Sequence, residues 1–223
     1  MNEKAQAFIR AVRLRKTYRG GGEDYEALRE VNLEVARGEF AAIVGPSGCG
    51  KSTLLYVLGG LTAATSGEVT IGGEELSTLG DAALSRLRGR TTGFVFQRFN
   101  LLPTLSIRDN LALAQAIRGA DCGGIDGLLA RVGLAEKAHR RPAELSMGEQ
   151  QRAAIARALA HRPAILLADE PTGNIDSGNS ARILDLLGAM HRDLGQTILL
   201  VTHDPGVAGA ADRVIRMRDG IIE

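Results

Sequence analysis

The stretch of sequence that decides the fold reads Gly45-Pro46-Ser47-Gly48-Cys49-Gly50-Lys51-Ser52. It matches the pattern G-x-x-x-x-G-K-[ST], which links a strand to a helix in proteins that bind phosphates. Residues 39–44 form an apolar run of buried-strand length, and residues 53–58 continue with helical character. The sequence therefore predicts a strand, a glycine-rich loop and a helix, in the order that the pattern requires.

The chemistry of this loop suits a nucleotide. Glycines let the backbone curl so that successive N–H groups point inward, at a helix N-terminus that carries partial positive charge. Lys51 is expected to reach the β- and γ-phosphates, and the Ser52 hydroxyl is expected to bind Mg²⁺. The alternative is a glycine-rich turn that matches by accident, and the flanking strand and helix argue against it.

The bulk composition is that of an ordinary soluble protein. The chain has 223 residues, of which 44% are hydrophobic and 24% are charged. This length fits one large α/β domain, or one domain with a small insert. The formal net charge of +1 gives no electrostatic reason to expect nucleic acid or an anionic membrane as a partner.

The cysteines and the apolar runs indicate a cellular setting. Cys49 lies inside the glycine-rich loop, where a disulfide to the distant Cys122 would distort it, so we expect a reducing, cytoplasmic compartment. Residues 1–6 lack an apolar leader, and no run approaches the roughly 18 apolar residues that span a bilayer. We therefore expect any membrane part to belong to another polypeptide.

The N-terminal part predicts a peripheral antiparallel sheet. Residues 8–14 and 27–35 have the pattern of strands, with a glycine turn between them at Gly20-Gly21-Gly22. Tyr18 lies just before this turn. The spacing alone leaves two interpretations of Tyr18 open, stacking on an adenine ring or simple surface packing.

Further along, the chain alternates strands and helices. Residues 66–73 predict a strand that ends in a turn, and residues 81–88 predict a short helix. Residues 93–96 predict a buried strand that ends on Gln97. A glutamine in that place can bind Mg²⁺ or orient water, although most such glutamines only satisfy loop backbone.

A helical segment interrupts the core. Residues 106–132 show a helical pattern without a strand, so we expect an all-helical insert over residues 98–160. Its last helix is expected to start after Ser146, within the stretch Leu145-Ser146-Met147-Gly148-Glu149. A serine and a glycine at a helix start suit a second phosphate contact.

The final third carries carboxylates and a histidine at strand ends. Residues 164–168 predict an apolar strand that ends on Asp169 and Glu170. We expect Asp169 to bind Mg²⁺ and Glu170 to act as a general base or to orient water, the alternative being a helix-capping acidic turn. A helix over 177–194 and a strand over 197–202 lead to His203, which is expected near the γ-phosphate or, alternatively, as a satisfied surface histidine.

These motifs together resemble the ATP-binding subunits of ABC transporters, over nearly the whole chain. Residues 45–52 resemble Walker A, Gln97 the Q-loop, residues 145–150 the signature motif, residues 165–170 Walker B and His203 the switch histidine. Residues 173–176 resemble the D-loop. The resemblance makes Tyr18 the A-loop aromatic.

The resemblance implies an α/β fold. It is a P-loop NTPase (RecA-like) core of residues 1–97 and 161–223, with a peripheral antiparallel β-subdomain and an inserted all-helical subdomain at about 98–160. ATP and Mg²⁺ are the implied cofactors, with Lys51, Glu170 and His203 catalytic. The implied metal ligands are Ser52, Gln97 and Asp169. The implied nucleotide contacts are Tyr18, Gly45, Pro46, Ser47, Gly48, Cys49, Gly50, Lys51, Ser52, Thr53, Gln97, Ser146, Gly148 and Glu149.

Two stretches narrow the resemblance. Residues 99–105 and 169–174 look most like the branch of lipoprotein-release, macrolide-export and cell-division ATPases. This branch implies a homodimer on the inner face of the cell membrane, beneath separate permease subunits that dock on residues 98–105. The alternatives are an ATPase that regulates a membrane partner such as a cell-division complex, or a soluble ABC-type ATPase acting on DNA or ribosomes, whose coiled coils or second cassette do not fit in this length.

The signature motif departs from the usual Leu-Ser-Gly-Gly-Gln. Met147 replaces the first glycine, and Glu149 replaces the glutamine. If Met147 needs a backbone conformation that glycine tolerates better, or crowds the nucleotide, closure driven by ATP is expected to be slower or weaker. Ser146 and Gly148 remain, so we expect an active site.

Overall fold

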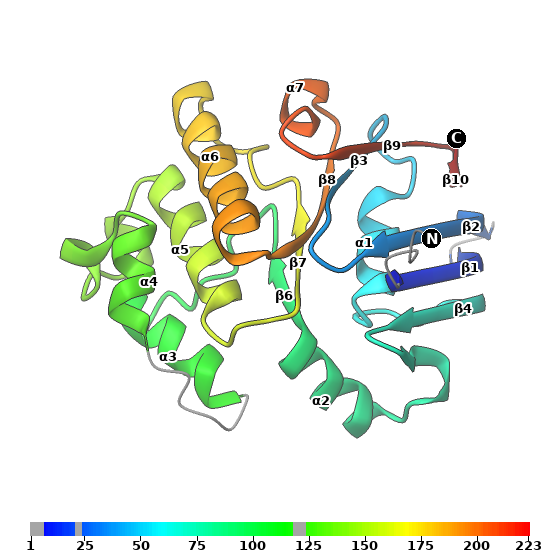
Figure 1. Cartoon of the computed structure of the whole chain (residues 1–223), viewed down its shortest axis with the longest axis horizontal. Helices are drawn as coiled ribbons and strands as arrows, with labels where there is room; N and C mark the ends of the chain where they lie inside the picture. Colours follow the sequence, from blue (N-terminus) through cyan, green and yellow to red (C-terminus); the bar gives the residue numbers. More distant parts are fainter. Residues whose placement is uncertain (1–6, 21–23, 118–123) are drawn as a thin grey trace, which may run out of the picture.

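The computed structural model describes residues 7–20, 24–117 and 124–223, and these residues form a six-stranded and a four-stranded sheet. The six strands lie in the order β10-β9-β3-β8-β7-β6 in the middle of the molecule (Figure 1). They are β3 (Phe40–Val44), β6 (Thr92–Val95), β7 (Ile165–Asp169), β8 (Thr197–Thr202), β9 (Arg213–Arg218) and β10 (Ile221–Ile222). Neighbours are parallel except β10, which runs antiparallel to β9.

The interiors of the central strands are apolar because both faces of the sheet are covered. Every residue of β7 and β8 is buried. Alternate side chains face opposite ways, so Leu166 and Ile198 pack into one cluster while Leu167 and Leu199 pack into the other. Such strands are nearly continuous hydrophobic runs, which is the pattern that the sequence shows.

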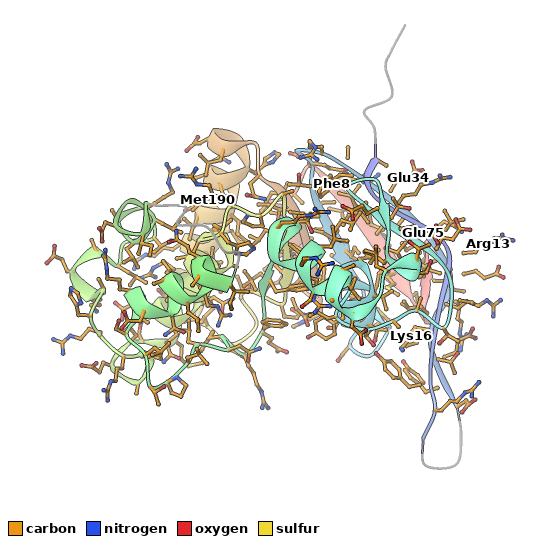
Figure 2. The ribbon with its side chains drawn as sticks, turned by 90° about the horizontal axis from the view of Figure 1, so that it is seen from below. Phe8, Arg13, Lys16, Glu34, Glu75 and Met190 are labelled. Atoms are coloured by element: carbon orange, nitrogen blue, oxygen red, sulfur yellow. The ribbon has the colours of Figure 1, made fainter. Side chains whose placement is uncertain are left out.

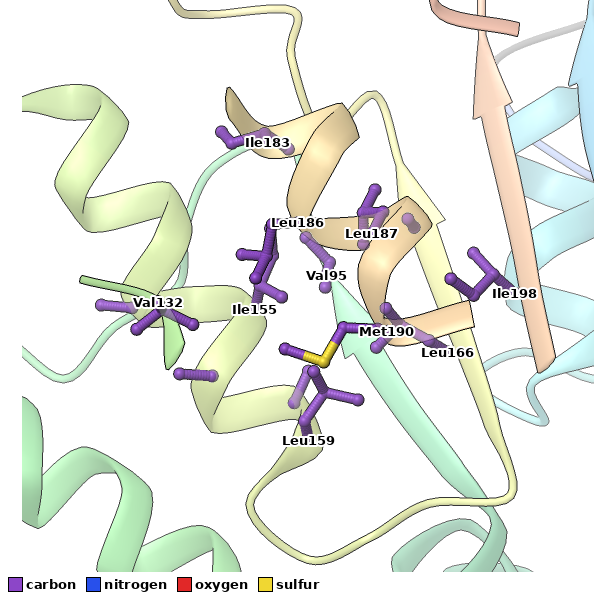
Figure 3. Packing of buried hydrophobic residues seen from close by; sticks show 14 of the residues in the cluster. Val95, Val132, Ile155, Leu159, Leu166, Ile183, Leu186, Leu187, Met190 and Ile198 are labelled. Carbon is purple, nitrogen blue, oxygen red and sulfur yellow. The ribbon is translucent and has the colours of Figure 1, made fainter. Parts of the chain in front are cut away.

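One face of the sheet is covered by helices from the second half of the chain. Ile155, Leu186 and Leu187 meet Leu166 and Ile198 on this face (Figure 3). The helices of this half are α3 (Ile107–Ile117), α4 (Ile125–Arg131), α5 (Met147–Leu159), α6 (Ser177–Leu194) and α7 (Pro205–Ala208), with 3-10 turns at Ala135–Lys137 and Pro142–Glu144. No strand occurs among the described residues between β6 and β7.

The other face carries α1 (Lys51–Leu58) and, beyond it, the four-stranded sheet. That sheet has the order β2-β1-β4-β5 and is antiparallel. Its strands are β1 (Ala7–Tyr18), β2 (Tyr25–Ala36), β4 (Ser66–Ile71) and β5 (Glu74–Glu75), followed by a 3-10 turn at Leu76–Thr78 and by α2 (Asp81–Thr91). Figure 2 shows Phe8, Arg13 and Glu34 at this end of the molecule and Met190 at the other.

Expected and observed elements agree most closely where caps define the ends. The Asp176 carboxylate accepts the Asn179 N–H at the start of α6, and Gly195 ends α6 with a φ of 61°, so this helix and β8 occupy the predicted residues. Strands β1 and β2 are longer than predicted, because they pair up to Tyr18 and Tyr25. Gly21, Gly22 and Cys122 lie outside the described residues.

Candidate functional site

The functional groups gather where the parallel strands end. Val44 pairs with Thr202, and Asp169 pairs with Val201, so β3, β7 and β8 finish at one edge of the sheet. Ligands of open α/β sheets bind at this edge. The topology therefore brings the glycine-rich loop, Asp169 and the residues after Thr202 together, although they lie far apart in the sequence.

The glycine-rich loop fits its place because two of its residues, Gly45 and Gly50, lack a side chain. A Cβ at Gly45 would lie 2.0 Å from the Met217 carbonyl oxygen, and one at Gly50 would lie 2.3 Å from the Ala27 carbonyl oxygen. Gly50 also has a φ of 104°, in the left-handed region that favours glycine. The loop is thus held between β2 and β9, with its backbone turned toward the edge of the sheet.

Lys51 is folded over this loop. Its ammonium donates to the carbonyl oxygens of Gly45 and Pro46, each at 2.8 Å, and the residue is only 6% exposed. The Cys49 sulfur lies 4.0 Å from the same ammonium and is also buried. A buried cation bonded to neutral carbonyls lacks a counter-charge there, which suits an anionic ligand.

Asp169 accepts hydrogen bonds from two hydroxyls on one face of α1. Ser52 Oγ donates to Asp169 Oδ1 at 2.8 Å, and Tyr56 Oη donates to Asp169 Oδ2 at 2.7 Å. Burial, and then the hydrogen bond to Asp169, raise the pKa of Tyr56 far above its ordinary value, so the phenol stays neutral and remains a donor. Each oxygen of the carboxylate therefore accepts one hydrogen bond, and the two bonds hold the carboxylate in one orientation.

Glu170 is held by groups from the end of β8. His203 Nδ1 lies 2.8 Å from Glu170 Oε1, and Thr202 Oγ1 donates to Glu170 Oε2 at 3.2 Å. The backbone of Glu170 has a φ of 46°, a left-handed conformation that strains a residue with a side chain. The strained backbone and the two contacts aim the carboxylate at the space above the loop.

These groups surround a cavity of about 500 Å³. It is lined by Tyr25, Ser47, Gly48, Gly50, Lys51, Ser52, Thr53, Gln97, Glu170 and His203. Gly45 and Pro46 instead line a neighbouring cavity that shares His203. The structure thus unites most of the residues that the sequence singled out for phosphate chemistry.

Two tyrosines in this region, Tyr25 and Tyr56, were not anticipated. Tyr25 lines the cavity and donates from its hydroxyl to the Gly48 carbonyl oxygen at 2.8 Å. Tyr18 pairs with it across the hairpin, is 42% exposed and has the Lys16 ammonium 4.9 Å from its ring centre. Hairpin pairing could have indicated Tyr25. Similarly, Tyr56 lies four residues after Ser52 on one helix face, a spacing that lets both reach the same partner.

The predicted second phosphate contact lies elsewhere. Ser146 caps α5, accepting the Glu149 N–H at 3.3 Å while its own N–H donates to Glu149 Oε2 at 3.0 Å. A Cβ at Gly148 would meet the Asn179 side chain at 2.6 Å. Met147 starts the helix without a positive φ, so the first of the two possibilities raised by the sequence, a backbone conformation that glycine tolerates better, does not apply. The methionine adds only bulk, and it is 51% exposed.

A separate hollow of about 380 Å³ follows Gln97. It is lined by Arg98, Phe99, Asn100, Leu101, Pro103, Pro142, Ala143, Met147, Gln150 and Asn174. The Asn174 amide donates to the Gln97 carbonyl oxygen at 2.8 Å, and Arg157 donates to the carbonyl oxygens of Phe99 and Asn100. Hydrogen bonds therefore connect residues 97–100 both to the loop after β7 and to α5.

The described residues contain no helix long and apolar enough to cross a membrane. They also contain no cluster of three or more histidine, cysteine, aspartate or glutamate side chains that would hold a metal by themselves.

Comparison with known proteins gives consistent matches. Residues 28–173 match the family model described as ABC transporter. The chain is 45% identical, over 94% of its length, to the macrolide export ATP-binding/permease protein MacB of Syntrophobacter fumaroxidans, and it spans only 30% of that protein. It is 43% identical to the lipoprotein-releasing system ATP-binding protein LolD of Xanthomonas euvesicatoria pv. vesicatoria, covering 98% of this chain and 91% of LolD.

Among solved structures, the chain resembles a dimeric ATP-binding cassette in a post-hydrolysis state bound to ADP and phosphate. The TM-score is 0.89 at 40% identity, and the match covers 96% of each chain. The chain therefore belongs to the ABC transporter family, as an ATP-binding and ATP-hydrolysing domain with the P-loop NTPase fold.

Proposed function

We propose that this chain binds ATP with Mg²⁺ in the cavity at the sheet edge, pairs with a second copy of itself through that ATP, and drives a change of shape in separate membrane subunits. One observation carries the proposal. Glu170 and His203 are in contact beside Lys51 and Ser52, while Ser146 and Gly148 lie outside the cavity. A second copy can bring its own Ser146 and Gly148 to that cavity.

The oxygen atoms around Ser52 fit Mg²⁺, which prefers oxygen ligands. The Ser52 hydroxyl and the Asp169 carboxylate are 2.8 Å apart, and Gln97 lines the same cavity as Ser52. We propose that these three residues bind the ion and that the hydrogen bond from Tyr56 orients the Asp169 carboxylate. Mg²⁺, when bound, neutralises charge on the phosphate oxygens.

We propose that Glu170 orients the attacking water. An ionised carboxylate only accepts hydrogen bonds, so His203 donates to it through Nδ1 and Thr202 donates through its hydroxyl. The carboxylate then accepts a proton from the water as the water oxygen attacks the γ-phosphorus and the bond to the β-phosphate oxygen breaks. Lys51 stabilises the charge on the phosphate oxygens by exchanging its carbonyl partners for them.

We propose that Tyr18 stacks on adenine. Tyr25 lies beside Tyr18 and contacts the glycine-rich loop. Tyr18 offers an exposed ring at the end of β1, and Tyr25 opposite it reaches the Gly48 carbonyl oxygen. A flat aromatic surface beside a phosphate loop suits a purine base.

The membrane partner follows from the relatives. LolD is named as part of a lipoprotein-releasing system, and MacB as an export protein that contains its own permease. We propose that separate permease subunits dock in the hollow after Gln97, with this chain on the cytoplasmic side of the membrane. Reversing the charge of Arg98 should uncouple transport while leaving ATP affinity intact, and loss of ATP affinity instead would argue against docking there.

The experiment for the ATP site is Glu170→Gln. The variant should bind ATP and dimerise, yet its hydrolysis rate should fall by about 10²-fold or more, the usual contribution of a general base. Glu34→Gln is a matched control, because Glu34 pairs with Arg10 on the outer strands, with both side chains exposed. If Glu170→Gln hydrolysed ATP at the wild-type rate, the proposal that Glu170 orients the attacking water would be wrong.

A further inference from the structure

The start of α5 carries an ionisable group where the family usually has an amide. Glu149 Oε2 accepts the Ser146 N–H at 3.0 Å, which completes the box of hydrogen bonds around the helix start. A glutamine could make this bond through its amide oxygen equally well. The carboxylate therefore adds a negative charge that the cap itself does not need.

A lysine from the 3-10 turn Ala135–Lys137 donates to the other carboxylate oxygen of Glu149. Lys137 Nζ donates to Glu149 Oε1 at 2.6 Å, and the Glu149 side chain is only 18% exposed. The Lys137 ammonium, and after it the Ser146 N–H, hold the pKa of Glu149 below its ordinary value. Each oxygen of Glu149 thus has a separate donor, and the carboxylate cannot turn without losing one of them.

The charge of Glu149 would oppose the ligand proposed for this surface. The N-terminus of α5 attracts anions through its free N–H groups, and the proposed function brings the triphosphate of a second copy against Ser146 and Gly148. An unpaired carboxylate in the same turn repels that triphosphate. An ammonium in contact with the carboxylate removes the repulsion and also fixes the rotamer that orders Ser146.

We propose that Lys137 is a positioning residue for the ATP site shared between two copies of the chain: it neutralises and orients Glu149, so that Ser146 meets the partner's triphosphate. This inference rests on the proposed function. Lys137 acts through Glu149 and is not among the residues that line the cavity of its own subunit. Its importance therefore depends on the glutamate in the signature motif, and disappears where that residue carries no charge.

A double-mutant cycle tests this dependence. Lys137→Met is made in two backgrounds, with and without Glu149→Gln, and every chain also carries Glu170→Gln so that hydrolysis does not dissolve the dimer. ATP-driven dimerisation is followed by sedimentation, and ATP affinity is measured below the dimerisation concentration. With Glu149 present, we expect Lys137→Met to weaken dimerisation roughly tenfold, the scale of a close charge pair. In the Glu149→Gln background the same change should shift dimerisation less than about twofold.

The controls separate positioning from general stability. Arg140→Met removes another ion pair of the same region, Arg140 with Glu144 at 2.8 Å, and should leave dimerisation unchanged. Lys137→Arg should keep dimerisation, and the ATP affinity of Lys137→Met monomers should equal that of the parent. An equal loss of dimerisation in both backgrounds, or no loss in either, would contradict the role of Lys137 but would leave the proposed function standing. If the Glu170→Gln parent neither binds ATP nor dimerises, the proposed function falls, and this inference with it.

Discussion

The chain carries two surfaces that we propose as contacts for ATP, and they differ in how deeply their residues are buried. The phosphate half, around Lys51 and Asp169, is buried, with these residues 6% and 4% exposed and bonded to their neighbours. The signature half, at the start of α5, presents Met147 with 51% of its surface exposed. Under the proposed function, we expect the first half to bind ATP alone and the second half to act only with another copy of the chain.

Removing the cation of the phosphate half should have the largest effect. Lys51→Met should weaken ATP binding by about a hundredfold, because hydrogen bonds to charged groups contribute about 1.5–3 kcal/mol each. Calorimetric titration with ATP and Mg²⁺ measures the change. Retention of wild-type affinity would show that the backbone of the loop alone binds the phosphates.

Changing the signature half should leave the ATP affinity of the monomer intact and weaken ATP-driven dimerisation. Ser146→Ala loses the side-chain acceptor that caps α5, which costs about 1 kcal/mol of stability. In a Glu170→Gln background, we expect ATP-driven dimerisation to weaken roughly tenfold, as for loss of one hydrogen bond to a charged group. A fall in the ATP affinity of the monomer would contradict the division into two halves.

Tyr56→Phe sharpens the description of the phosphate half. The change deletes the hydroxyl that donates to Asp169 Oδ2 at 2.7 Å while keeping the ring between its neighbours. We expect the Mg²⁺ concentration for half-maximal ATPase to rise about threefold to tenfold, as for loss of one hydrogen bond. Since the raised pKa of Tyr56 keeps the phenol neutral, the effect should not change between pH 6 and 9. A pH-dependent effect would mean that the hydroxyl itself titrates.

Met147→Gly should produce the smallest change. Met147 has an ordinary helical backbone, so glycine relieves no strain there and only removes exposed bulk. We expect ATPase turnover to change by less than about threefold, within the range of a typical surface substitution. An increase above tenfold would show that the methionine obstructs closure.

Local signals explain which features the sequence predicts well. Helix α6 and strand β8 occupy the expected residues because Asp176 and Gly195 mark the helix ends chemically. The glycine-rich loop is equally clear, since its pattern is continuous in sequence. The ends of parallel strands also place Glu170 and His203 together, as the topology of such sheets requires.

Contacts between distant segments explain what the sequence does not predict. Tyr25 reaches the Gly48 carbonyl oxygen only because β2 passes beside the loop, and Lys137 reaches Glu149 only because a 3-10 turn folds back on α5. Neither contact has a fixed spacing, and each depends on how packed elements lie against one another. The lengths of β1 and β2 depend likewise on pairing, which includes several register shifts.

At Glu170 the left-handed backbone favours a residue such as glycine, whereas the proposed hydrolysis needs a carboxylate. A residue with a side chain costs roughly 1–2 kcal/mol in that conformation, whereas glycine adopts it freely and asparagine adopts it more easily. Mutation toward either residue would relieve the backbone strain and remove the carboxylate, together with its contacts to Thr202 and His203. Random drift that is screened only for folding would therefore lose this glutamate early, and its retention in a lineage would record selection for turnover rather than for structure.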